Sequence, residues 1–254
     1  MSASPGRTAA VVTGAGRGIG RAIALELARA GADVALLARS PDELAGTASQ
    51  VRALGGAAML VPTDLGDLGQ VDAAVQRIRG EMGAVDILIN NAGVVWPLGP
   101  TEEVDPAEWA RAITINLTAP ATLTLCLLPA MLAKRRGRIV NVSSGAAGHP
   151  SSMIGGNAYV TGKTALEAHT LNLAAELADT GVTVNVFRPG TVDTAMQSWI
   201  RGQEPTKIGP DLHERFVRYQ ADGVLITPEQ SARSLVALLH GTSTGQVWTV
   251  AAES

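Results

Sequence analysis

Short, almost wholly apolar runs alternate along the chain with longer segments in which apolar residues recur every three or four positions. Runs that are apolar at nearly every position are typical of parallel strands covered on both faces, whereas the longer spacing is typical of helices. Seven such runs predict strands over residues 9–13, 34–38, 58–62, 85–90, 138–143, 182–188 and 246–250.

The intervening segments predict helices with recognisable ends. Gly31 follows the first of them, and Pro41 opens the second. Strands that alternate with helices build a parallel sheet covered on both faces, so we expect one α/β domain over residues 1–254, a doubly wound sheet of about seven strands. Residues 195–223 are expected to be irregular and to lie where ligands enter such folds. The predicted helices span residues 18–30, 41–54, 68–82, 106–134, 157–179 and 228–240.

Composition narrows the class of protein. The 254 residues are 46% hydrophobic, enough for one sizeable core, and the net charge of −3 shows no basic excess for nucleic acid. A single cysteine excludes a disulfide framework within the chain, and the four histidines lack metal-ligand spacing. The first residues lack the apolar core of a secretory signal, and the longest apolar stretch, 119–133, falls short of the ~20 residues a bilayer needs. We expect a cytoplasmic protein with no metal, nucleic-acid or membrane partner.

A glycine-rich turn joins the first predicted strand to the first helix. Such a turn lets the backbone approach a pyrophosphate, and the helix N-terminus supplies free N–H groups and a positive dipole end. The spacing does not fit Gly-x-Gly-x-x-Gly or the P-loop, but it does fit Thr-Gly-x-x-x-Gly-x-Gly. A turn without a ligand is the alternative. The turn reads Thr13-Gly14-Ala15-Gly16-Arg17-Gly18-Ile19-Gly20.

Tyr159 and Lys163 stand four residues apart in a predicted helix, so they share one face. A phenol normally titrates near ~10, and a nearby cation lowers its pKa toward neutrality. Such a tyrosine can exchange a proton with a substrate oxygen. A solvated pair on a helix surface is the alternative.

Five motifs in a fixed order resemble the short-chain dehydrogenase/reductase family, over about residues 7–250. The family implies a Rossmann-like single-domain sheet and hydride transfer with a nicotinamide cofactor. The motifs are the turn over residues 13–20, Asn90-Asn91-Ala92-Gly93, Ser144 after an apolar strand, Tyr159-x-x-x-Lys163, and Pro189-Gly190-Thr191-Val192-Asp193-Thr194.

The resemblance also implies catalytic roles. Tyr159 is expected to exchange the proton, Lys163 to lower the pKa of that phenol and hold the nicotinamide ribose, and Ser144 to bind the same substrate oxygen. Ser143 is expected to face the other side of its strand. Asn116 matches the asparagine that links the lysine to a water relay, and a polar residue at a helix bend is its alternative.

Charge predicts the choice of cofactor. An acid at the end of the second strand would bind the ribose hydroxyls of NAD, but Ala38 occupies that place and Arg39 follows it. Arg39 and Arg17 could grip a 2′-phosphate, which favours NADP(H), unless both are merely solvated. By resemblance to the family, Asp64 and Leu65 are expected to border the adenine, although Asp64 could instead serve as a turn or cap residue. The full cofactor set is Thr13, Gly14, Gly16, Arg17, Gly18, Ile19, Gly20, Arg39, Asp64, Leu65, Asn91, Ala92, Gly93, Tyr159, Lys163, Pro189, Gly190, Val192 and Thr194.

These features predict an NADP(H)-dependent oxidoreductase that interconverts ketones or aldehydes and alcohols. A 3-oxoacyl-thioester reductase is the nearest alternative, although residues 249–254 lack the glycine pair common in that branch, and a non-enzymatic NADP(H) sensor or scaffold is another. By resemblance we expect a homodimer or homotetramer packed through helices 106–134 and 157–179. The substrate is expected to be uncharged or weakly polar, because the candidate pocket wall is apolar. The wall candidates are Met153, Ile154, Met196, Trp199, Ile200 and Phe216.

Overall fold

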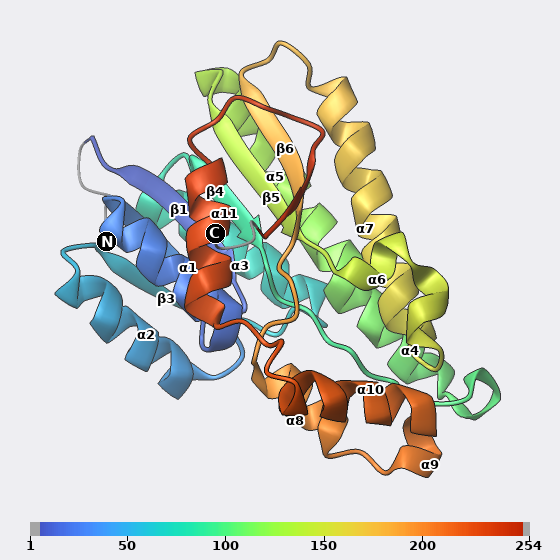
Figure 1. Ribbon diagram of the computed structural model, residues 1–254. Helices are drawn as coiled ribbons and strands as arrows, with labels where there is room; N and C mark the ends of the chain where they lie inside the picture. Colours follow the sequence, from blue (N-terminus) through green and yellow to red (C-terminus); the bar gives the residue numbers. More distant parts are fainter. Residues whose placement is uncertain (1–5, 251–254) are drawn as a thin grey trace.

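The computed structural model describes residues 6–250 and forms one parallel sheet of seven strands in the order β3-β2-β1-β4-β5-β6-β7 (Figure 1). β1 pairs with both β2 and β4, so the strand order reverses there and opens a crevice at the carboxyl ends of the strands. The seven predicted strands and the Rossmann-like doubly wound sheet are confirmed, with strand ends shifted by two residues at most. The strands are β1 (Thr8–Thr13), β2 (Ala32–Ala38), β3 (Ala58–Pro62), β4 (Ile87–Asn90), β5 (Gly137–Val142), β6 (Val182–Arg188) and β7 (Val247–Thr249).

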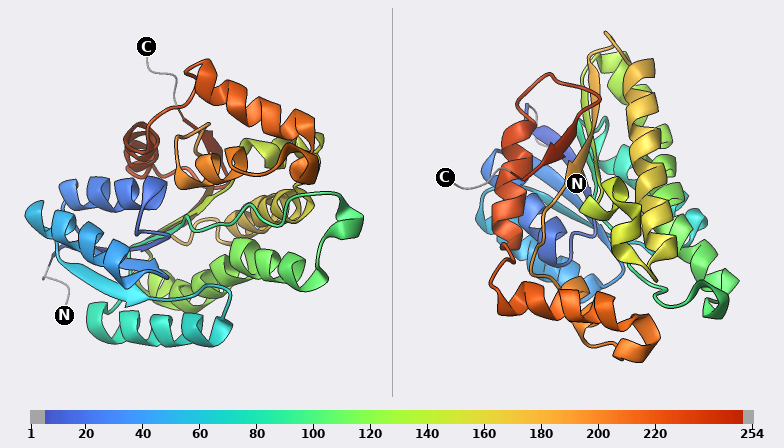
Figure 2. Two further views of the ribbon diagram at one scale, coloured as in Figure 1. Left: turned by 90° about the horizontal axis from the view of Figure 1, so that it is seen from below. Right: turned by 45° about the vertical axis from the view of Figure 1, so that its right-hand side comes forward.

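Helices cover both faces of the sheet, as the apolar runs predict. Figure 2 shows the two layers on opposite sides of the strands. On one face Ile23, Leu44 and Leu235 pack onto Val12 and Leu36. That layer consists of α1 (Gly18–Arg29), α2 (Pro41–Ala53) and α11 (Pro228–Leu238).

The second layer buries a larger set of aliphatic side chains against the other face. Val75, Leu123 and Leu173 pack there with Val11 and Ile139. The layer consists of α3 (Leu68–Met82), α4 (Pro106–Ile113), α5 (Ala119–Lys134) and α7 (Asn157–Glu176).

The helix predicted over residues 106–134 is not uniform. A π-helical turn, η2 (Thr114–Thr118), separates α4 from α5 and lies just before Pro120, which has no N–H to continue an α-helical ladder. The run Pro106–Lys134 has 29 residues and could cross a membrane by length and composition alone. Half of its most apolar window is buried in the protein, and one helix of this kind is weak evidence for a membrane span.

The segment over residues 195–223 is helical, so the prediction of irregular chain is wrong. It forms a lid of three short helices beyond the carboxyl ends of the strands (Figure 1). The segment is interrupted by Gly202, Pro205 and Gly209. These residues break the apolar periodicity of a longer helix, so the sequence did not predict the three helices. The lid consists of α8 (Ala195–Arg201), α9 (Pro205–Ile208) and α10 (Pro210–Ala221). Two shorter elements flank the crevice, α6 (Gly145–Gly148) and η3 (Pro150–Met153), and a short helical turn, η1 (Thr101–Glu103), precedes α4.

A buried chain of side-chain hydrogen bonds crosses the second layer. Nδ2 of Asn90 donates to Oδ1 of Asn141 at 2.8 Å and lies 3.3 Å from Oγ1 of Thr124. Nδ2 of Asn141 donates to Oγ1 of Thr170 at 2.8 Å, and that hydroxyl donates to the carbonyl of Leu166. The chain ties β4 to β5 and both strands to α5 and α7.

Candidate active site

A cavity of about 1470 Å³ lies where the carboxyl ends of the strands meet the lid. The structure brings almost the whole predicted site together on its wall, including Ser144, Tyr159 and Lys163. Of the predicted cofactor residues, those that line the cavity are Gly14, Gly16, Arg17, Gly18, Ile19, Gly20, Arg39, Asp64, Leu65, Asn91, Ala92, Gly93, Tyr159, Lys163, Pro189, Gly190, Val192 and Thr194.

The glycine-rich turn forms a backbone cradle that side chains would fill. Gly14 and Gly18 have φ values of +67° and +54°, a region that favours glycine. A Cβ on Gly20 would collide with the carbonyl of Gly14, and one on Gly16 would lie 2.8 Å from Oε2 of Glu43. No side chain caps α1, so its first N–H groups remain available to an anion. The cradle therefore fits a dinucleotide pyrophosphate.

Thr13 and Asn116 are absent from the cavity wall and instead hold the segment over residues 91–94. Oγ1 of Thr13 accepts hydrogen bonds of 3.0 Å from the amides of Asn91 and Ala92. The amide of Asn116 clamps both backbone polar groups of Val94, at 2.9 and 2.8 Å. Asn116 also lies in the π-helical turn, so the alternative of a polar residue at a helix bend fits its location.

Tyr159 is 8% exposed and packs in an apolar cluster with Val95, Met153 and residues of the lid. Burial raises the pKa of its phenol, and a hydrogen bond with Ser144 opposes that effect. The expectation that Lys163 lowers the pKa of this phenol remains a prediction, because the shift of this phenol comes from burial and from the hydrogen bond with Ser144. A protonated phenol held by a serine hydroxyl is arranged to act as an acid.

Lys163 is 3% exposed, and its Nζ donates to the carbonyl of Val142 at 2.8 Å. Burial lowers the pKa of this ammonium from 10.5 to about 8, and Glu167 one turn further along α7 opposes the shift. Gly93 leaves room for the amine, because a Cβ there would lie 3.1 Å from Nζ. The amine is therefore fixed beside the strand that leads to Ser144.

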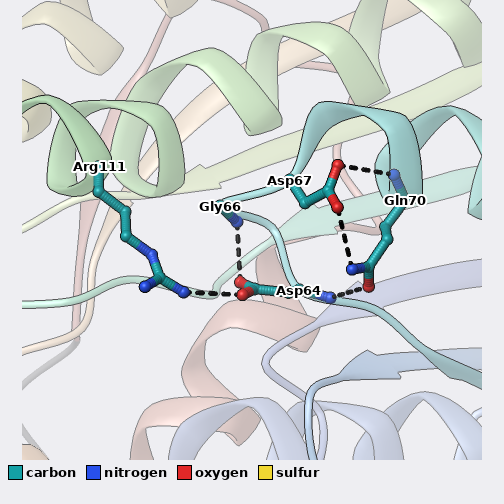
Figure 3. Close-up of polar contacts among 5 residues, drawn as sticks. All are labelled: Asp64, Gly66, Asp67, Gln70 and Arg111. Atoms are coloured by element: carbon teal, nitrogen blue, oxygen red, sulfur yellow. Dashed lines mark hydrogen bonds and ion pairs between the residues drawn. The ribbon is translucent and has the colours of Figure 1, made fainter.

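Asp64 both lines the cavity and organises the turn before α3 (Figure 3). Its Oδ1 accepts from the amide of Gly66 at 2.9 Å, and its Oδ2 from Nη2 of Arg111 at 2.8 Å. The N-cap of α3 is Asp67, which bonds the amide of Gln70, so the cap alternative for Asp64 does not hold. The turn alternative and a position bordering a cofactor are both compatible with this arrangement.

The two arginines predicted to bind a phosphate have different surroundings. Nη1 of Arg17 lies 3.3 Å from Oε1 of Glu43, and the side chain of Arg17 is exposed while that of Glu43 is partly buried. Arg39 is exposed on the cavity wall, and no carboxylate lies within ion-pair distance of it among residues 6–250. Glu43 also lines the cavity, and the sequence analysis missed it. Glu43 lies on α2, far along the chain from the glycine turn, and only folding brings the two together.

Several other residues of the wall were missed or misplaced. Ile154 is 80% exposed and lies outside the cavity, so its prediction as a wall residue is wrong. Ser143 was expected to face away, but it also lines the cavity, because β5 ends at Val142 and the alternation of faces stops there. Arg188 holds Glu167 with two hydrogen bonds of 2.8 and 2.9 Å beneath the site.

Arg215 and Tyr219 on α10 were also missed. The spacing of Leu212, Arg215, Phe216 and Tyr219 places them on one side of a helix and could have predicted α10. In the described part of the chain, no group of three or more His, Cys, Asp or Glu side chains could hold a metal ion.

Comparison with known proteins fixes the family. The family described as short chain dehydrogenase matches residues 8–205. The chain belongs to the short-chain dehydrogenase family. A short chain dehydrogenase of Pseudocercospora fijiensis is 37% identical over 193 residues, covering 75% of this chain but only 61% of the relative. The 3-oxoacyl-[acyl-carrier-protein] reductase FabG of Escherichia coli is 38% identical over 190 residues, 74% of each chain.

Solved structures agree with this assignment. A variant of actinorhodin polyketide ketoreductase crystallised with NADPH is 32% identical, with a TM-score of 0.86 over 98% of this chain and 97% of that one. The predictions of the family, the fold and an oxidoreductase are thus confirmed for this short-chain dehydrogenase.

Because Lys163 is buried, we expect the difference in stability between the wild type and a Lys163→Met variant to depend on pH. Between about pH 8 and 10.5 the folded protein holds this amine neutral while the unfolded chain protonates it, so unfolding takes up a proton. The free energy of unfolding of the wild type, minus that of Lys163→Met, should therefore rise by up to about 3 kcal/mol from pH 7.5 to 10.5. Urea denaturation at a series of pH values measures this difference.

The matched control is Lys207→Met, because Lys207 is 68% exposed, so this change removes a lysine at the surface and leaves the buried amine of Lys163 in place. A flat difference for Lys163→Met over this pH range would show that the amine is not desolvated.

Proposed function

We propose that this short-chain dehydrogenase reduces ketones or aldehydes to alcohols with NADPH, and catalyses the reverse oxidation with NADP⁺. The observation that carries the proposal is the set of half-buried Ser144 and buried Tyr159 and Lys163 on one wall of a cavity that also holds the glycine cradle. A phenol, a hydroxyl and an amine in one enclosed site suit proton transfer to a carbonyl oxygen.

Each side chain has a task in reduction. When bound, the cofactor supplies a hydride to the carbonyl carbon. Tyr159 donates its phenolic proton to the carbonyl oxygen, so its raised pKa in the empty protein keeps that proton available. Ser144 donates a hydrogen bond to the same oxygen as negative charge develops there. Lys163 stabilises the resulting phenolate and holds the nicotinamide ribose, while Asn116 positions Val94 and Gly93 beside it.

NADP(H) is the preferred cofactor because of the charge at the end of β2. Ala38 offers no carboxylate to repel a 2′-phosphate, and the exposed guanidinium of Arg39 is available to bind it. Arg17 contributes less to binding a 2′-phosphate than the sequence suggested, because the carboxylate of Glu43 partly neutralises its guanidinium. The NADPH bound to the actinorhodin ketoreductase is consistent with this choice.

A 3-oxoacyl thioester is a second candidate substrate. The similarity to FabG and to a polyketide ketoreductase favours it. The expected absence of a glycine pair counts against it, and residues 251–254 lie outside the described part of the chain.

NADPH oxidation followed at 340 nm tests the proposed function directly. The panel should contain simple ketones, aldehydes, diketones and acetoacetyl thioesters, and turnover of the thioesters alone would favour the second candidate. The change Tyr159→Phe should lower kcat by about 100-fold or more, the scale of general acid catalysis, while NADPH affinity persists. Near-normal kcat in this variant would remove Tyr159 from its role.

The change Arg39→Asp should move cofactor preference toward NADH. Loss of the guanidinium and addition of a carboxylate both oppose a 2′-phosphate, so the ratio of kcat/KM for NADPH to that for NADH should fall by about 100-fold. Arg79→Asp is the matched control, because Arg79 is exposed on α3, away from the cavity, and the net charge changes equally. An unchanged ratio in Arg39→Asp would mean that Arg39 is merely solvated.

We also propose that the protein is cytoplasmic and forms a homodimer or homotetramer through the outer faces of α5 and α7. Leu125 on α5 is 62% exposed and Leu171 on α7 is 39% exposed, and large apolar side chains of this kind are often covered by a second copy. Leu125→Lys should raise the monomer fraction measured by light scattering at micromolar concentration. A wild-type monomer at that concentration would contradict the proposal.

A further inference from the structure

Most charged side chains on the cavity wall are already neutralised by a neighbour. An ion pair has little net charge with which to attract a ligand. A cation on the wall without such a partner can therefore bind a negatively charged group of a ligand. Three pairs account for the neutralised groups: Arg17 with Glu43 at 3.3 Å, Asp64 with Arg111 at 2.8 Å, and Arg188 with Glu167 at 2.8 Å.

Two guanidiniums on the wall have no carboxylate within ion-pair distance among residues 6–250. One is Arg39, which the choice of cofactor already explains. The other is Arg215, which lies on α10 of the lid and has no part in the proposed chemistry so far. Its Nε is fully buried without a hydrogen-bond partner. A buried guanidinium N–H without an acceptor is costly, and a ligand oxygen would satisfy it.

The position of Arg215 places it on the substrate side of the cavity. Its neighbour Phe216 packs against the apolar cluster that contains Tyr159. Tyr219, one turn further along α10, also lines the cavity, and its ring meets Phe216 edge-on at 5.7 Å. Gln197 on α8 lines the same cavity, and its Oε1 is buried without a partner as well. Two helices of the lid thus contribute cavity-lining side chains that each contain a buried polar atom without a partner.

We propose that Arg215 binds a carboxylate on the substrate, so that the enzyme acts on oxo acids and the corresponding hydroxy acids. This inference rests on the proposed function, since the carbonyl must lie at Tyr159 while the carboxylate lies at Arg215. One unpaired guanidinium offsets one negative charge, which favours a carboxylate over a phosphate dianion. The amide of Gln197, turned over, would donate a second hydrogen bond to that carboxylate.

The structure thus changes the expectation of an uncharged substrate. That expectation came from the apolar wall candidates, of which Met153, Met196, Trp199, Ile200 and Phe216 do line the cavity. Only the folding of α10 places a cation among them.

The test compares oxo acids of increasing length, from 4-oxopentanoate to 8-oxononanoate, with the methyl ester of each. Steady-state kinetics with NADPH give kcat/KM, and calorimetry with the NADP⁺-saturated protein gives Kd. At the length that spans both groups, the wild type should prefer the acid to its ester by about 10- to 100-fold, the range for one charge-assisted hydrogen bond. Arg215→Met should abolish this preference through KM, so that the acid and its ester have equal kcat/KM.

Two further variants separate the charge from the fold of the lid. Arg215→Lys should restore part of the preference, because it keeps the charge but not the planar fork of donors. Arg218→Met is the matched control, since Arg218 lies on the same helix, 62% exposed and 3.7 Å from Glu214. It should behave like the wild type.

Equal constants for acid and ester in the wild type would overturn the proposal while neutral ketone turnover still supports the reductase. A raised KM for NADPH in Arg215→Met would also overturn it, since the guanidinium would then serve the cofactor. If no carbonyl is turned over, the proposed function fails, and the Kd comparison between acid and ester still decides whether Arg215 binds a carboxylate.

Discussion

The buried hydrogen-bond chain from Asn90 through Asn141 to Thr170 is the constraint on which the site depends. Each amide in it is enclosed in the core, where an unsatisfied polar group costs about 1–3 kcal/mol. A shift of β4 against β5, or of α7 against the sheet, would leave several of these buried polar groups without hydrogen-bond partners at once. The chain therefore fixes the relative positions of the three elements that lead into Asn91, Ser144 and Tyr159.

The same enclosure sets the electrostatics of the site. Tyr159 lies beneath apolar side chains of the lid and of the loop after β4, and Lys163 is 3% exposed one turn further along α7, so neither is stabilised by water in its charged form. The phenol keeps its proton and the ammonium gives its proton up more easily. Near neutral pH the phenol therefore keeps its proton, while Lys163, with a pKa of about 8, is still mostly protonated.

Charge is distributed unevenly around the cavity. The pairs Arg17–Glu43 and Arg188–Glu167 hold segments of the wall together and contribute little free charge to it. The guanidiniums without partners stand on separate elements, one after β2 and one on α10. Because the two guanidiniums lie on separate elements, they suit two negative groups that are far apart, either on one ligand or on a cofactor and a substrate bound side by side.

The sequence by itself determined the parallel sheet, both helical layers and most of the site. Strand runs, the glycine turn and the Tyr159–Lys163 spacing are local patterns, and the carboxyl ends of parallel strands necessarily share one edge. It could not reveal that Asn116 clamps Val94, that desolvation governs Tyr159, or that Glu43 and Arg215 reach the cavity. Those facts depend on contacts between residues far apart in the chain and on how much water the packing excludes. Only the tertiary structure decided them.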